Sequence, residues 1–572
     1  MKKYILSAIA VIGALAMTSC SDFLQPKPEG QPTTAQYFTN DQQAIDAVDA
    51  FLRPQTDCDA FYGREYQGIM YETNMGVVGK TKGWTTVLNH NYVGNSEQEP
   101  IAEPFYCATK YAARANYVVQ GLKEKEGKNN ALTYIEKRSL GEALFWRALY
   151  HWVLAFRHGL PTQGVPFVNY EKIEGGYDNR IPTQQATVME DYQMVIDDLK
   201  EAATYLPTIT EYSAAEKGRA SADAAVALQA KVYAYWAAWD ASKWNNVIEV
   251  VNTLEKAPYN RALIADYEDL FTYDKSKWAN SEEILGIYCH GQETSPGGTE
   301  WPGVMFENKG WGKWNGWGQG KPTLDLYETF VEDDSKLINP AKGNIRKKRT
   351  IVEYGDYFRY LGEDFYFYST SDLETGFMCG KYIKGFELGT DLPSCMKAGG
   401  CNEGGDWPFT TCVVPILRFA DCKLLRAEAY IMTGKPDLAK NDINEIRNRG
   451  NVKSLDHTPT MADIYHERRV ELAFEINDPF QDLRRWSVSS NAEIKRLALA
   501  ELTAKPRVRH YTDRAKAGEW VDGKWVPNTD YTIGEYSDNG YQRTWSDEKV
   551  VYPYPQGEVD KSNGALKQNP GY

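Results

Sequence analysis

The residues best suited to bind a ligand lie in one tryptophan-rich stretch, residues 301–320. Indole rings offer flat apolar faces on which the C–H face of a sugar can stack, while side-chain amides hydrogen-bond to hydroxyl groups. This combination favours a carbohydrate-binding segment. The candidate ligand-binding residues in it are Trp301, Trp311, Trp314, Asn315, Trp317 and Gln319.

The local conformation of this stretch follows from its glycines. Trp311, Trp314 and Trp317 are spaced by three and would share one face of a helix. However, interleaved glycines each cost a helix about 1 kcal/mol relative to alanine. An irregular loop is therefore favoured. The alternative is that the indoles anchor the loop to the protein core, and we expect roughly half of them to do so.

A second, weaker candidate lies upstream. Trp84 follows a lysine and a glycine, and Asn89 and His90 come shortly after it. The pattern again places an aromatic ring beside polar groups, so Trp84 and Asn89 are added to the candidate ligand-binding residues.

Standard catalytic signals are missing from the sequence. It contains no HExxH, GxSxG or EF-hand pattern, and Gly320-Lys321 fails the phosphate-loop pattern because Asn315 and Pro322 occupy the wrong positions. Seven histidines leave little material for a histidine-rich metal site. We therefore expect no catalytic residue, no cofactor and no metal. A carboxylate pair for glycoside hydrolysis is a less favoured alternative, because such a pair is defined only in space.

Arginine and glutamate are concentrated in two short segments, residues 466–475 and 482–486. Glu471 or Glu475 could in principle be catalytic. Arginine–carboxylate pairing that fixes helices against one another is the favoured interpretation.

Composition sets the broad class. The chain has 572 residues, 42% of them hydrophobic and 25% charged, which is typical of a soluble globular protein of several domains. Its net charge of −14 argues against nucleic acid as a partner, because phosphate binding needs a basic surface.

The N-terminus is typical of an exported protein. Lys2 and Lys3 precede an apolar run over residues 5–17, and small residues then lead to Cys20. This pattern predicts a signal peptide over 1–19, lipid modification of Cys20, and a proline-stiffened tether over 20–35. The alternative is a plain secretory signal with an incidental cysteine. Because no later run is long and apolar enough to span a membrane, the lipid would be the anchor.

Eight further cysteines remain, and none of them form a CxxC motif. Export permits disulfides, and Cys395 with Cys401 is the best candidate pair, although free buried thiols are an equally good interpretation.

Helical periodicity dominates much of the chain. Apolar residues over 188–206 follow one helix face, with Thr187 and Glu190 placed to form a capping box at its start. Stripes over 228–239 and 244–254 predict two antiparallel helices joined by a short turn. A similar pair is predicted around 427–430 and 438–446, where Leu438, Ile443 and Ile446 continue the pattern.

Further helices are expected around 105–122, 136–158 and 460–476. The fold class predicted is mainly α, with tetratricopeptide-like helix pairs forming a scaffold. Two regions look irregular: residues 291–411, a loop-rich ligand-binding region with short β segments such as 365–368, and the chain from about residue 500 to its end.

Several motifs occur in an order that carries a family resemblance. They lie at residues 415–421, 426–430, 445–449, 467–475, 482–486, 552–556 and 568–572. Together they resemble the SusD/RagB family of surface lipoproteins from Gram-negative bacteria of the gut and mouth, over nearly the whole chain. One local departure is Ile476-Asn477-Asp478-Pro479, where the family usually has a glycine and a basic residue.

The resemblance implies a domain organisation and a function. It implies a helical N-terminal region over 36–290, and a C-terminal region over 291–572 with helices at about 415–486. It also implies capture of oligosaccharides at the cell surface and their delivery to a TonB-dependent, SusC-like transporter in the outer membrane, without catalysis. A peptide-binding or glycopeptide-binding member of the same family is the first alternative, and a surface glycoside hydrolase is the second.

Overall fold

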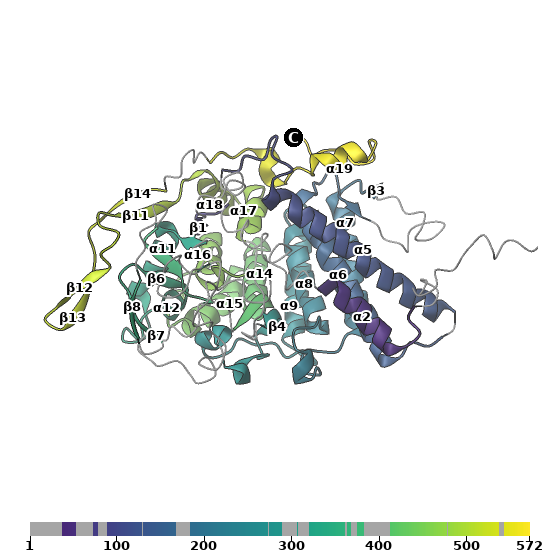
Figure 1. Cartoon of the computed structure of the whole chain (residues 1–572), viewed down its shortest axis with the longest axis horizontal. Coiled ribbons are helices and arrows are strands. Elements are labelled where there is room, and N and C mark those ends of the chain that lie inside the picture. The colour runs from purple at the N-terminus through teal and green to yellow at the C-terminus, as the bar shows by residue number, and fades with distance from the viewer. Residues whose placement is uncertain are drawn as a thin grey trace, which may run out of the picture.

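A computed structural model describes thirteen parts of the chain. They are residues 37–52, 72–77, 89–128, 130–167, 183–272, 274–288, 306, 320–360, 363–367, 375–382, 412–476, 479–536 and 543–572. Figure 1 shows helices over much of the molecule, with most of the labelled strands toward its left end and β3 at the opposite end. The expected class, mainly α with tetratricopeptide-like helix pairs and short β segments, is confirmed.

The first half of the chain forms a row of helices, each packed against the next (Figure 1). The long helix α6 lies at its centre, and its Trp146 and Trp152 side chains are almost fully buried. The helices are α2 (Asp41–Leu52), α5 (Glu99–Gly127), α6 (Tyr134–His158), α7 (Val188–Tyr205), α8 (Ala222–Trp236) and α9 (Trp244–Leu254).

Local sequence accounts for α7. Its apolar stripe is buried, and the Thr187 side chain accepts a hydrogen bond from the Glu190 N–H at the first turn. The capping box is only half formed, because the Glu190 carboxylate accepts from the Ala186 N–H rather than from Thr187. The chain leaves the helix at Leu206, before a proline.

The two predicted helix pairs are present. A short 3₁₀ turn, Ala241–Lys243, joins α8 to α9, and α14 (Phe419–Met432) packs on α15 (Pro436–Arg449). Ile443 and Ile446 are buried as predicted, but Leu438 is 48% exposed. That prediction was wrong because Leu438 lies in the first turn of α15, which faces solvent.

The second half holds more regular structure than the sequence suggested. Within region 291–411, the residues that the structure describes include two helices. The expectation that this region consists mostly of loops therefore applies to only part of it. Besides α14 and α15, the helices are α11 (Leu324–Val331), α12 (Ile345–Thr350), α16 (Met461–Leu472), α17 (Pro479–Ser487), α18 (Ala492–Thr503) and α19 (Gln556–Lys561).

The strands form small antiparallel pairs rather than one sheet. The pair β4–β10 packs beside α8 and α14, and β8 covers part of the predicted β segment at 365–368. The pairs are β1 (Gly76–Val77) with β5 (Lys321–Pro322), β2 (Pro166–Phe167) with β3 (Thr183–Gln184), β4 (Glu283–Tyr288) with β10 (Val413–Arg418), β6 (Ile351–Glu353) with β9 (Phe377–Cys379), and β7 (Tyr357–Tyr360) with β8 (Glu363–Tyr366).

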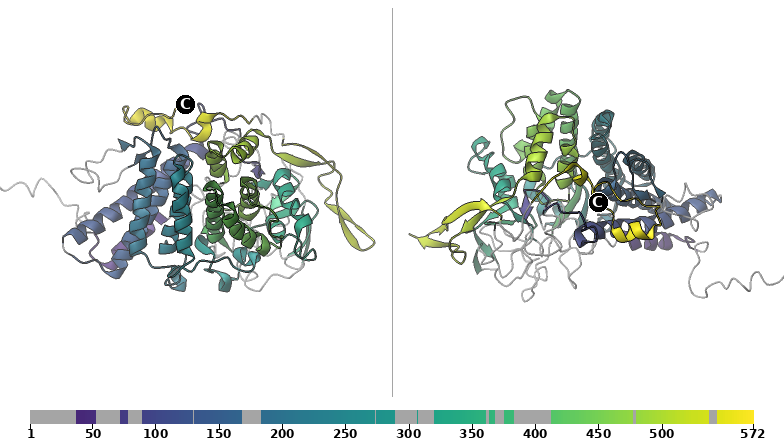
Figure 2. Two further views of the ribbon diagram at one scale, coloured as in Figure 1. Left: turned by 180° about the vertical axis from the view of Figure 1, so that it is seen from behind. Right: turned by 90° about the horizontal axis from the view of Figure 1, so that it is seen from above.

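Residues 507–535 form a two-stranded arm that extends away from the helices in every view (Figures 1 and 2). Here β11 (Arg507–Tyr511) pairs with β14 (Tyr531–Glu535), and β12 (Gly518–Val521) pairs with β13 (Lys524–Pro527). Asp522 and Gly523 both have positive φ at the tip, as a tight hairpin turn requires. The expectation of irregular structure beyond residue 500 was therefore wrong here.

The C-terminal tail, residues 543–572, lies across the ends of the helices (Figure 1). The Asn569 side-chain amide donates to the His158 and Tyr552 carbonyls, both at 2.8 Å. The Tyr552 N–H donates in turn to the Arg157 carbonyl at 2.7 Å. These bonds attach the end of the chain to α6, nearly 400 residues away in sequence.

Cys379 and Cys422 are buried thiols, and burial raises the pKa of Cys379 to about 12. Cys395 and Cys401, the candidate disulfide pair, lie outside the described residues. Within the described ranges no helix combines the length and the apolarity needed to cross a bilayer.

A buried ion network joins the strands to the C-terminal helices. Arg418 contacts Glu282 at 2.8 Å, Glu471 at 2.7 Å and Glu475 at 2.5 Å, while Lys381 contacts Glu475 at 2.6 Å. Its basic members are Arg346, Lys381, Arg418, Arg447 and Arg449, and its acidic members are Glu282, Asp333, Glu467, Glu471 and Glu475. These ten charges balance, and at the edge of the network His466 pairs with both Asp333 and Glu332.

A second buried group of ions binds α14, α16 and α17 together. Arg468 bridges Asp421 and Asp482, and Arg485 makes a bidentate pair with Glu428 at 2.6 and 2.7 Å. The arginines and acids singled out in the sequence are thus structural, as the favoured interpretation held.

Truncating Arg485 to alanine should lower the free energy of unfolding by about 3–5 kcal/mol, because Glu428 and Asp482 keep their charges in a buried place without this partner. Arg507→Ala is the matched control: its side chain is 42% exposed beside Asp325, so the loss should be about 1 kcal/mol or less. Urea unfolding measures both, and equal losses would contradict the structural assignment.

Candidate ligand-binding site

Of the candidate residues, only Asn89 lies within the described structure. Cys20, Trp84, Trp301, Trp311, Trp314, Asn315, Trp317 and Gln319 lie outside it. The described residues nevertheless show where the chain enters and leaves the two candidate segments, and those attachment points can be compared.

The two segments attach to one pair of strands. Residues 78–88, which include Trp84, directly follow β1, and residues 307–319 directly precede Gly320 and β5. Because β1 and β5 are antiparallel, with Val77 opposite Lys321, the start of the first segment lies beside the end of the second. Segments that are more than 200 residues apart in sequence therefore share one attachment point.

Segment 72–77 is completely buried and is held by polar groups from several parts of the chain. The Asn74 N–H donates to Glu501 Oε1 at 2.8 Å, and Arg543 Nη1 donates to Asn74 Oδ1 at 2.8 Å. The Thr323 hydroxyl, beside β5, donates to the Asn74 carbonyl. The attachment point is thus fixed on three sides.

Phe306 provides a second attachment for the tryptophan-rich stretch. Its ring stacks on Tyr382, with centroids 5.9 Å apart, and meets Phe474 edge-on at 5.7 Å. Phe474 also lies against β1, because a Cβ on Gly76 would be only 3.3 Å from its ring. One buried phenylalanine thus supports both segments.

Phe474 adopts an unusual backbone conformation, with φ of +60°. A left-handed conformation in a residue other than glycine costs about 1–3 kcal/mol and persists only when its surroundings impose it. Before this corner Lys381 donates to the Ala473 carbonyl, and after it both Lys381 and Arg418 donate to the Glu475 carboxylate. The buried ion network therefore holds the corner on which the site rests.

Sequence reasoning missed a buried cluster at the other end of the site. Tyr92 and Tyr552 both donate hydrogen bonds to the Glu72 carboxylate, and His90 Nε2 lies 3.1 Å from the Glu72 carbonyl. Burial raises the pKa of Glu72 to about 7, against the opposing effect of the two tyrosines. His90 stacks on Phe480, and burial lowers its pKa.

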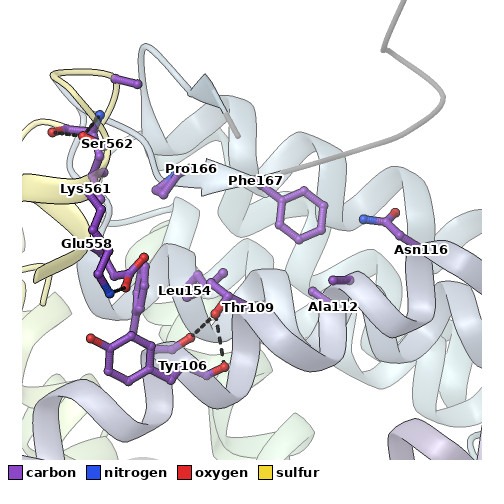
Figure 3. A pocket seen from close by; sticks show the side chains of 14 residues that line it. Tyr106, Thr109, Ala112, Asn116, Leu154, Pro166, Phe167, Glu558, Lys561 and Ser562 are labelled. Carbon is purple, nitrogen blue, oxygen red and sulfur yellow. Dashed lines mark hydrogen bonds and ion pairs between the residues drawn. The ribbon is translucent and has the colours of Figure 1, made fainter. Parts of the chain in front are cut away.

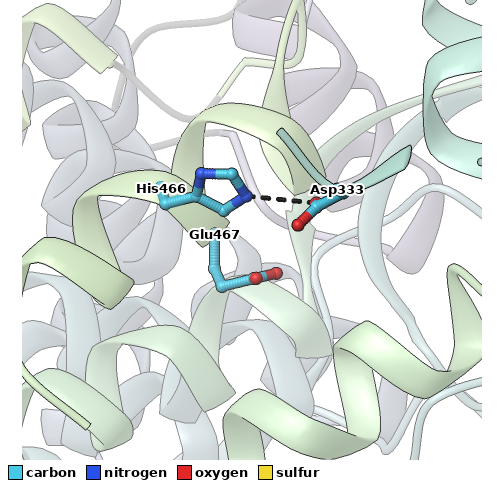
Figure 4. Close-up of side chains that lie close together, drawn as sticks. All are labelled: Asp333, His466 and Glu467. Atoms are coloured by element: carbon cyan, nitrogen blue, oxygen red, sulfur yellow. Dashed lines mark hydrogen bonds and ion pairs between the residues drawn. The ribbon is translucent and has the colours of Figure 1, made fainter. Parts of the chain in front are cut away.

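Asp333, His466 and Glu467 are close enough together to be tested as a metal site (Figure 4). Arg346 and Arg447 contact both carboxylates, and His466 Nε2 lies 3.1 Å from Asp333 Oδ2. Burial lowers the pKa of His466, but hydrogen bonds to Asp333 and Glu332 outweigh it and raise the pKa to about 9. A protonated histidine and two arginines already occupy the positions beside the carboxylates that a metal ion would need. The group therefore does not fit a metal site.

A cavity of about 590 Å³ lies between α5, α6, β2 and α19 (Figure 3). Several of its polar groups are bonded internally: the Thr109 hydroxyl donates to the Phe105 carbonyl, the Ser562 hydroxyl to the Val559 carbonyl, and Lys561 pairs with Glu558. Those groups offer little to a sugar, and different elements form the β1–β5 attachment point.

Glu471 and Glu475, the acids considered for catalysis, cannot reach a substrate. They are 0% and 3% exposed, and both contact Arg418. Burial alone would raise the pKa of Glu471, but Arg449, Arg418 and Arg346 lower it to about 2. Both carboxylates pair with Arg418 inside the buried ion network, which is a structural role.

Comparison with known proteins identifies the family. The family model described as "SusD family" matches residues 281–572, more than half of the chain, and a model described as "Starch-binding associating with outer membrane" matches residues 22–234. The chain belongs to the SusD family. The resemblance seen in the motifs is thereby confirmed.

Individual SusD relatives are distant. A SusD-like protein from Bacteroides ovatus is 24% identical over 503 residues, covering 85% of this chain and 83% of its own. A SusD homologue from Bacteroides thetaiotaomicron superposes with a TM-score of 0.68 at 20% identity, covering 96% and 100% of the two chains.

One structural neighbour is a complex with a sugar. Surface glycan-binding protein A from Bacteroides thetaiotaomicron, in complex with laminarihexaose, superposes with a TM-score of 0.63 at 18% identity, covering 93% and 100% of the two chains. At these identities the similarity establishes the fold.

The charge on His466 predicts a pH dependence. Because its pKa is raised from 6.5 to about 9, its contribution to stability is fully present below pH 6.5 and is lost as the pH rises through about 9. His466→Gln should lower the unfolding free energy by about 2–3 kcal/mol at pH 6 and have little effect at pH 10.

Urea unfolding at the two pH values measures this difference. Addition of Zn²⁺ or Ca²⁺ should leave the melting temperature of the unmodified protein unchanged. A rise of several degrees with either ion would contradict the assignment of Asp333, His466 and Glu467 as an ion cluster.

Proposed function

We propose that this protein binds oligosaccharides at the cell surface, using aromatic side chains of segments 78–88 and 301–320. The single observation that carries the proposal is the β1–β5 pairing, which gives both segments one attachment point. The candidate residues for contact with the sugar are then Trp84 and the nearby Asn89, together with Trp301, Trp311, Trp314, Asn315, Trp317 and Gln319.

The similarity to a surface glycan-binding protein in complex with laminarihexaose supports a glycan over a peptide. The composition of the loop favours the same choice, since four indoles and the amides of Asn315 and Gln319 suit sugar rings and hydroxyls. A peptide or glycopeptide ligand remains the alternative within the family.

The energetics suit capture followed by release. If a sugar covers roughly 60–80 Å² of an indole face, each stack contributes about 1.5–2 kcal/mol. Two or three stacks supply about 3–6 kcal/mol, and each hydrogen bond adds about 1 kcal/mol, while association costs about 4 kcal/mol or more. With three stacks and hydrogen bonds from two amides the balance is about 4 kcal/mol, which corresponds to millimolar binding and is weak enough for transfer to another protein.

The same proposal includes a partner and an anchor. A TonB-dependent, SusC-like transporter in the outer membrane would receive the ligand, and lipid on Cys20 would hold the protein at the outer face of that membrane. The description of the family model over residues 22–234 supports the outer-membrane location. The role is non-catalytic: incubated oligosaccharides should be recovered intact, whereas a surface glycoside hydrolase would release products.

Single alanine substitutions at Trp311, Trp314 and Trp317 test the sugar site. At least one should weaken binding about tenfold, the loss of one stack, without lowering the melting temperature. Calorimetry against a glycan selected on an array measures this, with Trp520→Ala on the exposed arm as control. Normal binding by all three folded variants would place the site elsewhere and make these indoles core anchors.

Cys20→Ala tests the anchor. The variant should appear in the soluble fraction while keeping the wild-type melting temperature, because stable attachment needs the acyl chains of a lipoprotein. Fractionation in cells without the transporter separates lipid attachment from binding to that partner. Full retention of the variant in the membrane fraction would contradict the lipid anchor.

A further inference from the structure

The cavity between α5, α6, β2 and α19 is a groove that follows one face of α5 (Figure 3). Phe105, Thr109, Ala112 and Asn116 line it at intervals of four, three and four residues, so they form one row along the helix. Because an α-helix rises about 1.5 Å per residue, this row is about 16 Å long. The groove is therefore elongated.

The walls of the groove are mostly apolar. Leu154 of α6 and Phe167 of β2 are buried side chains that line it. The Phe167 ring lies parallel to the His151 ring, with centroids 3.6 Å apart, which fixes the wall at that end. Ala112 and Ala113 contribute small side chains that leave space for a ligand. A ligand in this groove therefore has to present apolar surface.

The polar side chains of the lining are bonded to the protein itself. The Thr109 hydroxyl donates to the Phe105 carbonyl at 2.9 Å, and the Ser562 hydroxyl donates to a carbonyl of its own turn at 2.7 Å. The side-chain oxygen of Asn116 accepts a hydrogen bond from Arg147 at 3.0 Å. A sugar, whose hydroxyls need hydrogen-bond partners all round the ring, does not suit such a lining.

Charges stand at one end of the described lining, beside Tyr106 and opposite Phe167 and Asn116 (Figure 3). There Glu558 and Lys561 of α19 form an ion pair at 2.9 Å, and Glu97 Oε2 lies 3.4 Å from the Tyr106 hydroxyl. Burial, Glu97 and Glu558 raise the pKa of Tyr106 to about 12. Two acids thus accompany the one base of the lining, which disfavours an anionic group at this end.

We propose that this groove binds the unbranched acyl chain of a lipid whose headgroup carries no net negative charge. The chain lies along α5, and the headgroup lies at the α19 end. A zwitterionic headgroup complements the pair there, with its anionic part toward Lys561 and its cationic part toward Glu558. The proposal does not depend on the binding of a glycan elsewhere in the protein.

Two further observations fit a lipid chain. The hydrocarbon core of a bilayer is about 30 Å thick, so one leaflet of about 15 Å matches the groove in length. The cavity volume of about 590 Å³ lies in the usual range for ligand pockets. The family model described as "Starch-binding associating with outer membrane" covers residues 22–234, which include α5 and α6, and supports a location near lipid.

A series of alkylphosphocholines tests the length of the groove. Homologues with eight to sixteen carbons, each below its micelle-forming concentration, are titrated by calorimetry into the full chain carrying Cys20→Ala, which needs no detergent. Affinity should rise about fourfold with each methylene that is buried and level off near about twelve carbons, where the chain fills the groove. No binding at any length, or affinity that still rises from twelve to sixteen carbons, would overturn the proposal.

The headgroup distinguishes a lipid from a free fatty acid. Dodecanoate and dodecylphosphocholine carry chains of equal length, but dodecanoate brings a carboxylate to Glu97 and Glu558. Dodecylphosphocholine should bind at least about threefold more tightly, and added salt should reduce the difference. Tighter binding of dodecanoate would overturn the assignment of the headgroup and identify a fatty acid as the ligand.

Two substitutions place the chain in this groove. Ala113 and Ala565 are exposed residues of its lining, so Ala113→Trp and Ala565→Trp each fill part of it without disturbing the core. Either variant should weaken binding of dodecylphosphocholine about tenfold or more, the effect of excluding two methylenes or more, at an unchanged melting temperature. Ala500→Trp is the matched control, because Ala500 is an exposed alanine of α18 outside the groove. Wild-type affinity in both folded groove variants, or an equal loss in Ala500→Trp, would overturn the proposal.

Discussion

The buried ion network around Arg418 and Glu471 is the constraint on which the candidate site depends. Isolated charges at such depth would cost several kcal/mol each, so every member needs its partners in place. Arg418 alone joins β10 to Glu282, Glu471 and Glu475. Removing one partner leaves an uncompensated buried charge. The elements that carry these charges must therefore all be in place together.

The network is linked to the candidate site through one corner of the chain, at Phe474. Residues 473–475 bind Lys381 and Arg418, and between them Phe474 is held in a left-handed conformation. Its ring packs against Phe306 and lies beside Gly76. The buried charges thereby set where the chain leaves the scaffold toward both candidate segments.

The sequence predicted the helices well because their apolar periodicity is local, as in α7 and the α8–α9 pair. It also predicted that Arg468 and Arg485 pair with acids, since arginine in a helical segment rich in carboxylates has few other stable arrangements. The β1–β5 pairing could not be predicted from the sequence, because two-residue strands more than 200 residues apart carry no periodic signal. The dipeptide Asp522-Gly523 is typical of a hairpin turn, but the irregular pattern around it hid that signal. The sequence near Phe474 and Glu72 contains no signal that predicts the left-handed conformation of the one or the buried carboxylate of the other.

The central claim is that segments 78–88 and 301–320 form one site. A double-mutant cycle on glycan affinity tests it most directly, with Trp84→Ala, Trp317→Ala and the combined variant measured by calorimetry against one oligosaccharide. If both indoles contact the same ligand, each single variant weakens binding about tenfold and the combined variant weakens it further, while all three stay folded. Wild-type affinity in either folded single variant would contradict a shared site.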